Sequence, residues 1–316
     1  MPRPVVIAHR GASGYLPEHT LEAKAAAHAM GADYIEQDVI ASRDGVLLVL
    51  HDVYLEAVTD VAQRFPERAR ADGHYYAVDF DYEEIATLIV HERTAPVAED
   101  TSAQRQLFDD RFPADIGRFR VSTLQDELEL IAGLNRSTGR QAGIYPEIKD
   151  PAWHIENGID LTHLVMTALD DFGYLRSSEA AELPRAVLQC FDAAELRRIR
   201  SDLNPSIPLV QLLTDDDDMS EEGLASIAGY AQGIGPALSS LVGRDGDAVV
   251  SNERCRTAQS YGLLVHPYTF RRDRLPSFSS DFESLLRFFI ADVGVDGIFT
   301  DFPDIAVAVI HGMNLN

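Results

Sequence analysis

Short apolar runs recur along the chain and alternate with segments of helical periodicity. Eight runs have the length and apolar content of buried parallel strands, at residues 5–9, 34–40, 143–149, 186–191, 208–213, 232–236, 263–269 and 297–301. Helical patterns lie between them, including an alanine-rich segment at 20–30, apolar positions 124, 128, 131 and 134 within 123–134, and a segment polar on one side at 193–203. Strand and helix repeated eight times predict an α/β fold, a parallel (β/α)8 TIM barrel.

Residues 53–120 break this rhythm. The segment is rich in Asp, Arg, Tyr and Pro, with only a short amphipathic stretch at 82–90. It is too long for a simple loop, so we predict an insertion between the second and third β/α units, packed over the mouth of the barrel. A lid that faces the substrate and a purely structural elaboration both fit this pattern. His74, Tyr75 and Tyr76 are its candidates to reach a site.

Composition sets outer limits on fold and function. The 316 residues are 46% hydrophobic, enough for a single barrel domain over 1–316 that carries the insertion. A formal net charge of −24 argues against binding of nucleic acid or anionic membranes. No run approaches the ~18 apolar residues of a membrane span. Two cysteines form no disulfide framework, and Cys190, within an apolar run, is expected to be a buried thiol.

The amino terminus leads straight into the first predicted strand. This leaves no room for the hydrophobic region of a signal peptide, so the expected location is cytoplasmic. A periplasmic or secreted location would follow if a leader had been removed.

Three carboxylates indicate a metal site. Glu36 and Asp38 stand at i and i+2 of a predicted strand, so both point to one face. Paired carboxylates repel each other unless a proton or cation lies between them. Glu147 adds a third carboxylate in the strand at 143–149, two residues before Lys149. An all-carboxylate set without a nearby cysteine favours one Ca²⁺ or Mg²⁺ ion over zinc.

Two histidines are expected beside these carboxylates. His9 ends the first strand, at the end where parallel barrels build their active sites. Asp44 and Gly45 between two apolar runs predict a hairpin turn. Cross-strand partners would then sum to about 89, which places His51 opposite Asp38. A slip of one residue would turn His51 to the other face.

Positive charge near these groups would suit an anionic substrate. Arg10 offers a fork that matches phosphate oxygens, and Lys149 adds a point charge. Each motif taken alone is common on solvated surfaces, and it is their coincidence at strand ends that favours a site. His266, at the end of the seventh strand, is a further candidate for the pocket lining.

Other conspicuous polar residues have plainer interpretations. The run at 215–218 is interpreted as a solvated loop that caps the next helix rather than a calcium site. The remaining histidines are interpreted as surface or capping residues: His19, His28, His91, His154, His163 and His311.

An ordered set of motifs carries a family resemblance along nearly the whole chain. They are HRGASGYLPEHT at 9–20, EQD at 36–38, HD at 51–52, PEIK at 146–149, QCFD at 189–192, HPYT at 266–269 and TDFP at 300–303. The set strongly resembles glycerophosphodiester phosphodiesterases, most of all the bacterial periplasmic type. The resemblance implies hydrolysis of small-molecule glycerophosphodiesters, such as glycerophosphocholine or glycerophosphoethanolamine, to sn-glycerol 3-phosphate and an alcohol.

The resemblance also implies roles for individual residues. Glu36, Asp38 and Glu147 would hold calcium or magnesium, and His9 and His51 would act as acid and base. Arg10 and Lys149 would lie near the phosphate, with Phe191 and Tyr268 around the glycerol or the leaving group. The 2-hydroxyl of the glycerol or a water molecule would attack, and the sequence leaves both routes open.

Two alternative functions remain at this stage. A lysophospholipase D or sphingomyelinase D-like enzyme would need an apolar channel, and the acidic insertion presents no obvious face that seeks membranes. A non-catalytic protein that binds a polyol phosphate would have no need for two proton-transferring histidines. The sequence gives no prediction of oligomeric state.

Overall fold

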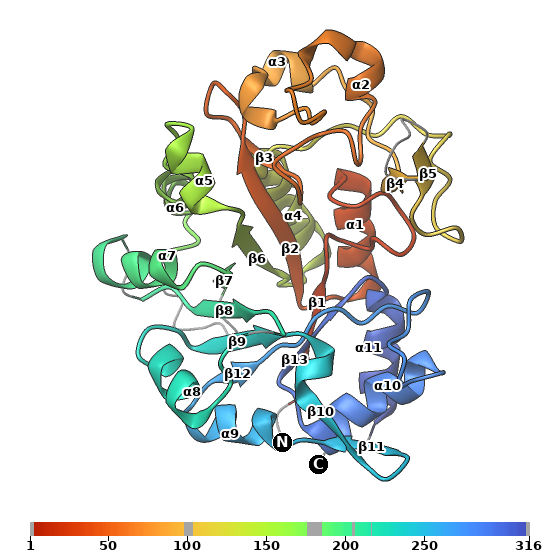
Figure 1. Cartoon of the computed structure of the whole chain (residues 1–316), viewed down its shortest axis with the longest axis vertical. Helices are drawn as coiled ribbons and strands as arrows, with labels where there is room; N and C mark the ends of the chain where they lie inside the picture. Colours follow the sequence, from red (N-terminus) through yellow and green to blue (C-terminus); the bar gives the residue numbers. More distant parts are fainter. Residues whose placement is uncertain (1–2, 98–103, 176–184, 204–205, 216, 314–316) are drawn as a thin grey trace.

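Eight parallel strands form a nearly closed barrel in the computed structural model, which describes residues 3–97, 104–175, 185–203, 206–215 and 217–313 (Figure 1). Their order is β12-β9-β8-β7-β6-β2-β1-β13. The backbone N–H of Phe270 donates to Phe299 O at 2.8 Å, which links the chain after β12 to β13. The barrel strands are β1 (Val5–Ala8), β2 (Tyr34–Ala41), β6 (Gly143–Ile148), β7 (Leu188–Cys190), β8 (Leu209–Leu213), β9 (Gly233–Pro236), β12 (Leu264–Val265) and β13 (Gly297–Thr300). All eight predicted strands are confirmed.

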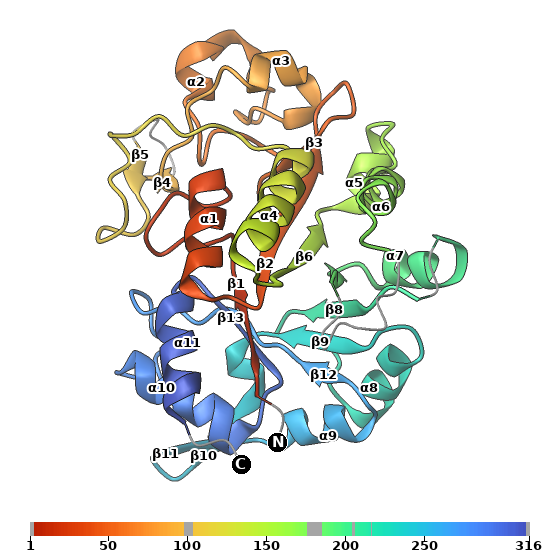
Figure 2. The same ribbon diagram turned by 180° about the vertical axis from the view of Figure 1, so that it is seen from behind.

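Helices cover the outside of the barrel, and α1, α4 and α11 lie side by side over β1 and β2, on the side that faces the viewer in Figure 2. The larger helices are α1 (Leu21–Met30), α4 (Leu124–Thr138), α5 (Pro151–Glu156), α6 (Leu161–Asp171), α7 (Ala193–Arg198), α8 (Glu221–Ala228), α9 (Arg254–Ser260), α10 (Phe282–Phe288) and α11 (Pro303–Gly312). The helix predicted at 193–203 continues past α7 as a short π-helix, Ile199–Leu203. A second π-helix, Phe289–Val293, follows α10.

Local sequence signals set the ends of these helices. Thr20 caps α1 by accepting a hydrogen bond from the N–H of Ala23, and Gly31 ends it in the left-handed region at φ 99°. Thr123 and Asp126 form a reciprocal capping box at the start of α4. Ser220 caps α8, and Asp218 accepts from the Ser220 N–H at 2.8 Å. This agrees with a capping role for the acidic run at 215–218, although Asp216 lies outside the described residues.

The predicted hairpin forms, but its register differs by one residue. β3 (Leu47–Val49) pairs antiparallel with β2 through Val39↔Val49, Ile40↔Leu48 and Ala41↔Leu47, so that partners sum to 88. Leu50, not His51, therefore lies opposite Asp38, and its N–H donates to Asp38 O at 2.9 Å. The ladder ends there, and the chain bends at His51. Because His51 lies outside the ladder, the alternation of faces along a strand does not determine the direction of its side chain.

The insertion, residues 53–120, follows β3 and precedes helix α4. In Figure 1 its α2 and α3 lie at the top, away from both termini, and its β4 and β5 lie at the right, beside α1. Its elements are α2 (Val61–Arg64), α3 (Tyr82–Ile85), β4 (Thr94–Pro96), β5 (Gln104–Gln106) and the 3₁₀ turns Pro66–Arg68 and Ala77–Asp79. Leu55, Phe80 and Leu88 belong to an apolar cluster that is formed mainly by the insertion itself and is separate from the barrel core. Since the loops after barrel strands surround the active-site face, the insertion stands beside that face.

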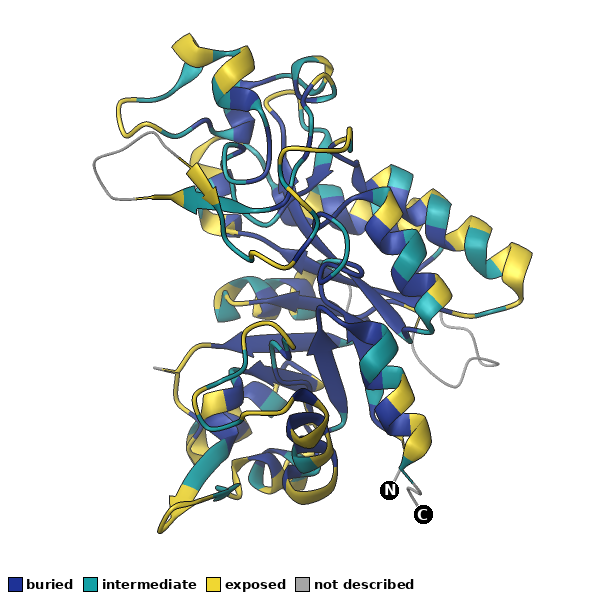
Figure 3. Cartoon of the chain, turned by 90° about the vertical axis from the view of Figure 1, so that its right-hand side faces the viewer, coloured by how far each residue is buried: buried dark blue, intermediate teal, exposed yellow. Residues whose placement is uncertain are grey.

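Burial follows the layers of the barrel (Figure 3). Every residue of β2 and β6 is buried, whereas the helices bury one side only. The barrel interior is filled by Ile7, Tyr34, Tyr145, Val187, Val210 and Phe299. Both cysteines are buried free thiols, as predicted for Cys190. At the other end of the molecule, after the 3₁₀ turn Leu238–Leu241, strands β10 (Val242–Asp245) and β11 (Ala248–Ser251) form a small hairpin.

Among the residues described, none of the helices combines the length and the apolar character that crossing a membrane requires.

Candidate active site

One cavity of about 160 Å³ brings together all nine residues predicted to act in catalysis, metal binding or substrate binding. His9, Glu36 and Asp38 come from the first two barrel strands and the turn after β1, and Glu147 and Lys149 from β6 and the residue that follows it. The lining also includes residues that the sequence did not single out, namely Gln189, Leu212, Thr269, Arg271 and Phe299. The complete set of predicted residues lining it is His9, Arg10, Glu36, Asp38, His51, Glu147, Lys149, Phe191 and Tyr268.

The three carboxylates form a compact cluster. Asp38 and Glu147 are register partners on the adjacent parallel strands β2 and β6, and Glu36 lies two residues before Asp38 on the same face. One ligand oxygen from each carboxylate lies within 4.8 Å of the others. Burial, together with the charge of the neighbouring carboxylates, raises the pKa of Glu36 well above its usual value. Burial raises the pKa of Glu147 to about 8, despite the opposing charge of Lys149.

This cluster could bind a metal ion. Asp38 Oδ1 is buried and has no hydrogen-bond partner among the described residues, so one carboxylate oxygen is left for a cation. Gln189 Nε2 donates to Glu36 Oε1 at 2.8 Å and fixes that carboxylate. The donor set is all oxygen, which suits a hard divalent cation.

His9 is held by a carboxylate on the far side of its ring. Its Nδ1 lies 2.6 Å from Asp301 Oδ1, at the end of β13, and Nε2 is 3.9 Å from Glu36 Oε2. Because the ionised Asp301 accepts only, Nδ1 carries the hydrogen and the Nε2 of the neutral ring keeps its lone pair. Burial lowers the pKa of His9 to about 4, against the raising effect of Asp301.

His51 has the same kind of arrangement, with a carboxylate at its Nδ1. Its Nδ1 lies 2.6 Å from Asp52 Oδ1, which leaves Nε2 free. Burial opposes ionisation of Asp52, but the hydrogen bond from His51 and the charge of Arg93 lower its pKa to about 2. Burial and the charge of Arg10 lower the pKa of His51. Two histidines therefore share the cavity, each with one nitrogen occupied by an aspartate.

Three cationic side chains line the same cavity. The Arg10 Nη1 donates to both oxygens of Glu18 at 3.0 Å, and its Nε lies 3.3 Å from Asp38 Oδ2. Lys149 Nζ is 2.8 Å from Glu147 Oε1, and Arg271 is the third cation. These three positive groups balance the three lining carboxylates when all are ionised. A bound divalent cation would make the lining net positive, which suits an anionic substrate.

His19 corrects the interpretation of the remaining histidines as surface or capping residues. It is buried, and its Nε2 lies 2.8 Å from Asp38 Oδ2. Lys24, also fully buried, contacts His19 Nδ1 at 3.0 Å and Glu127 Oε2 at 3.2 Å. The sequence offers no signal for this role, because His19 lies in a turn at φ 59°, outside any helical or strand periodicity.

Two more histidines are buried for structural reasons. His28 lies 3.0 Å from Asn135 Oδ1, and His154 Nε2 accepts from the Ala41 N–H at 3.3 Å. Both bridge a helix to a neighbouring element, so the surface interpretation was wrong for them as well. His163 and His311 are exposed, as predicted.

His266 is not among the residues that line the cavity, although it was a candidate. It is buried, and its Nδ1 lies 2.9 Å from the hydroxyl of Tyr145 inside the barrel. The insertion's three candidates, His74, Tyr75 and Tyr76, do not line the cavity either. His74 stacks on Tyr54 at 4.5 Å, and Tyr76 stacks on Trp153 at 5.5 Å, outside the cavity lining.

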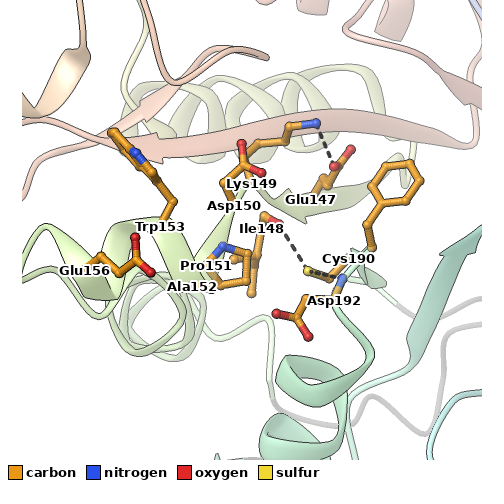
Figure 4. Close-up of a pocket in the computed structure, with 11 residues that line it drawn as sticks. Glu147, Ile148, Lys149, Asp150, Pro151, Ala152, Trp153, Glu156, Cys190 and Asp192 are labelled. Carbon is orange, nitrogen blue, oxygen red and sulfur yellow. Dashed lines mark hydrogen bonds and ion pairs between the residues drawn. The ribbon is translucent and has the colours of Figure 1, made fainter.

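Two further cavities adjoin the site. One, of about 370 Å³, shares Glu147 and Lys149 with it and extends along Asp150, Trp153 and the start of α5 (Figure 4). Figure 4 shows the Lys149 amine turned toward Glu147, away from Trp153. The other, of about 170 Å³, is shared between the barrel and the insertion. It is lined by His9, Arg10, Ser13, Glu18, His51, Arg93, Leu107, Phe108, Arg111, Arg271, Arg274 and Asp301.

Known proteins resemble this chain over almost its full length. A sequence profile described as "Glycerophosphoryl diester phosphodiesterase family" matches residues 9–305. A glycerophosphodiester phosphodiesterase of Haemophilus influenzae is 39% identical, covering 98% of this chain and 90% of the relative. One of Treponema pallidum is 34% identical over 96% and 90% of the two chains.

Solved structures share the fold. A crystal structure from Silicibacter pomeroyi, described as a candidate glycerophosphoryl diester phosphodiesterase, matches with a TM-score of 0.74 at 25% identity, over 100% of this chain and 96% of that one. An Oleispira antarctica phosphodiesterase in complex with the product sn-glycerol-3-phosphate matches with a TM-score of 0.66 at 20% identity, over 98% and 97%.

Proposed function

The chain belongs to the glycerophosphoryl diester phosphodiesterase family and is an enzyme of that class. We propose that it hydrolyses glycerophosphodiesters, such as glycerophosphocholine or glycerophosphoethanolamine, to sn-glycerol 3-phosphate and an alcohol. It uses one Ca²⁺ or Mg²⁺ ion held by Glu36, Asp38 and Glu147. His9 and His51 are its acid and base.

The observation that carries this proposal is the pair of histidines facing one carboxylate cluster. Each has its Nδ1 occupied by an aspartate, so each presents Nε2 to the cavity. Cleavage of a phosphodiester needs one group to accept the proton of the nucleophile and another to protonate the departing alcohol. Two such groups around one anionic substrate meet this need, whereas ligand capture alone requires neither.

The chain's own residues divide the work. One histidine Nε2 accepts the proton of the attacking oxygen, from water or from the 2-hydroxyl of the glycerol, as that oxygen bonds to phosphorus. If the 2-hydroxyl attacks, the cyclic phosphate that forms is then opened by water to give sn-glycerol 3-phosphate. The other histidine, protonated at Nε2, donates its proton to the alcohol oxygen as the second P–O bond breaks. Arg10, Lys149 and Arg271 supply positive charge beside the phosphoryl oxygens. A bound divalent ion would add charge stabilisation at the same oxygens.

Phe191 and Tyr268 form an aromatic wall of the cavity. Their rings meet edge to face with centroids 6.1 Å apart, and the Tyr268 hydroxyl donates to Leu213 O at 2.9 Å. That hydrogen bond fixes the tyrosine ring while its face remains available for contact. We assign this wall to the glycerol or the leaving alcohol.

The decisive experiment is release of sn-glycerol 3-phosphate from glycerophosphocholine, after EDTA and again with calcium or magnesium restored. Release that stops with EDTA and returns with either metal supports the proposal. A lysophospholipid serves as the comparison substrate. Release that survives exhaustive chelation would refute the proposal that the carboxylate cluster holds a required metal. Separately, His9→Ala or His51→Ala should lower turnover about 10²- to 10⁴-fold.

A further inference from the structure

In both histidine–aspartate pairs, the second oxygen of the aspartate accepts a hydrogen bond from an arginine of the insertion. Arg93 Nη1 lies 2.6 Å from Asp52 Oδ2, while Asp52 Oδ1 holds His51. The same guanidinium also binds Glu18, since its Nη2 lies 2.6 Å from Oε1 and its Nε lies 3.0 Å from Oε2. Glu18 in turn accepts from Arg10. One guanidinium thus fixes the aspartate behind His51 and the glutamate behind Arg10.

Arg111 occupies the matching place behind the other histidine. Its Nη2 lies 2.6 Å from Asp301 Oδ2, while Asp301 Oδ1 holds His9. Its Nε lies 2.7 Å from Asp273 Oδ2, and its Nη1 donates to Ser13 O at 3.2 Å. The side chain of Arg111 is only 4% exposed, and that of Asp301 is 1% exposed.

The two arginines reach the barrel from different parts of the insertion. Arg93 directly precedes β4, and Arg111 follows β5, so the small β4–β5 hairpin lies between them in the chain. Figure 1 shows this hairpin beside α1, on the side of the molecule that carries the turn after β1. The insertion therefore contacts the site through charged groups, while its own apolar cluster lies elsewhere.

We propose that Arg93 and Arg111 are positioning residues, through which the insertion fixes the orientation and tautomer of His51 and His9. This inference rests on the acid and base roles proposed above. Under this proposal the insertion is neither a lid nor a purely structural elaboration, because it supports the two catalytic histidines. The arginines act through Asp52 and Asp301 and need no contact with substrate.

The physical reason lies in the shared use of each aspartate. One oxygen bonds the histidine and the other bonds the arginine, so the carboxylate plane is fixed at both ends. Without Arg93, Asp52 Oδ2 would lose the donor that lies 2.6 Å from it, and the carboxylate could rotate or draw in water. Without Arg111, Asp301 Oδ2 would keep the Arg271 Nε at 2.8 Å but lose the donation from Nη2 at 2.6 Å, so this carboxylate would be held at fewer points. The histidine would then lose its fixed ring orientation. Removal of such an outer partner typically lowers activity about 10- to 100-fold.

Arg70 provides a matched control within the insertion. It forms a comparable bidentate pair with Asp79, at 2.7 and 2.8 Å, and its guanidinium stacks over Tyr76 at 4.2 Å. Arg70 lines neither the site nor the cavity shared with the insertion. Arg70→Ala therefore reports loss of an ion pair in the insertion without loss of a contact to a histidine's aspartate.

The experiment compares steady-state turnover of Arg93→Ala, Arg111→Ala and Arg70→Ala with that of the wild type. We expect kcat to fall ~10- to 100-fold in the first two, with KM changed by less than about threefold, and Arg70→Ala to retain wild-type kcat. Arg93→Lys and Arg111→Lys should recover part of kcat. Raised KM at unchanged kcat would overturn the proposal, since it would mean that the arginines bind substrate.

A second substrate separates support of a histidine from general loss of structure. The p-nitrophenyl ester of glycerol phosphate releases a phenolate that needs no protonation, so a defect in the acid histidine should matter less. One of the two arginine variants should lose much less kcat on this ester than on glycerophosphocholine, and it identifies the acid. Equal losses on both substrates in both variants would overturn the proposal. No turnover by the wild type on either substrate would instead refute the proposed function.

Discussion

His19 donates its Nε2 hydrogen to Asp38 Oδ2 across 2.8 Å, in a fully buried contact. The tautomer follows from Lys24, whose ammonium at 3.0 Å can only donate and so obliges Nδ1 to accept. Burial and the charge of Lys24 lower the pKa of His19 to about 3, so the ring is neutral at physiological pH. Asp38 therefore has its Oδ2 fixed by His19, while its Oδ1 has no hydrogen-bond partner among the described residues and is available to a cation.

We predict that His19→Ala weakens binding of the divalent cation. Loss of the donor leaves Asp38 Oδ2 with only the longer contact to Arg10 Nε, at 3.3 Å, so the carboxylate is held less firmly. Removal of such outer-shell partners typically costs 10- to 100-fold in metal affinity. Calcium or magnesium titration by calorimetry measures the change. His28→Ala is the control, because it removes another buried histidine, on α1, that contacts Asn135 instead of a carboxylate of the cluster. Equal affinity in the two variants would contradict a role for His19.

A second prediction concerns the buried pair behind His19. Lys24 and Glu127 are both fully buried, with Nζ and Oε2 3.2 Å apart. Lys24→Met leaves Glu127 buried without its cation and should lower the free energy of unfolding by about 3–5 kcal/mol. Adding Glu127→Gln should restore part of that loss, because a neutral amide is easier to bury. Urea unfolding of the two single variants and the double variant gives the coupling, and strictly additive losses would contradict the pairing.

The barrel could be read from the sequence because its strands are short apolar runs whose positions need no tertiary information. Glu36, Asp38 and Glu147 could be identified because ligands on strands obey the alternation of faces. His19 could not, since it lies in a turn at φ 59°, where no periodicity says which way a side chain points.

The contacts of Arg93 and Arg111 could not be predicted from the sequence for a related reason. Arg93 and Arg111 stand 41 residues from Asp52 and 190 from Asp301 along the chain, in a segment with little periodic structure. Their contacts depend on how that segment packs as a whole.

The error in the hairpin register has a local cause instead. The Asp-Gly signal correctly located the turn, and only the number of residues assigned to the turn was wrong, which shifted the predicted pairing by one residue.

Gly11→Ala should destabilise the protein and reduce turnover. Gly11 has φ 89°, and a Cβ atom there would lie 2.8 Å from the backbone carbon of Ala23, so strain and overlap add. We expect a loss of more than ~2 kcal/mol in unfolding free energy, with the turn that carries Arg10 displaced. Gly45→Ala is the control, with φ 78° and nothing within 4 Å, and should cost only ~1–2 kcal/mol. Chemical denaturation of both variants tests the difference, and equal losses would contradict the overlap.

The last prediction concerns Glu92, the residue before Arg93. Its side chain is buried, and Oε2 has no hydrogen-bond partner among the described residues. Burial raises its pKa from 4.5 to about 8, against the opposing charge of Arg111. The folded state therefore holds this proton more tightly than the unfolded state does. The stability contributed by the protonated carboxyl is complete below pH 4.5 and is lost as the pH rises through about 8.

Glu92→Gln replaces the protonated acid with a neutral side chain of the same shape. At pH 5 its unfolding free energy should be close to that of the wild type, and at pH 9 the variant should be more stable by an amount on the order of a few kcal/mol. Urea denaturation at both pH values measures the difference, in which the titration of other groups largely cancels. Glu83→Gln, at an exposed position of α3, reports the effect of removing a carboxylate charge alone. A gain at pH 9 no larger than at pH 5 would mean that Glu92 is ionised in the folded protein and paired with Arg111.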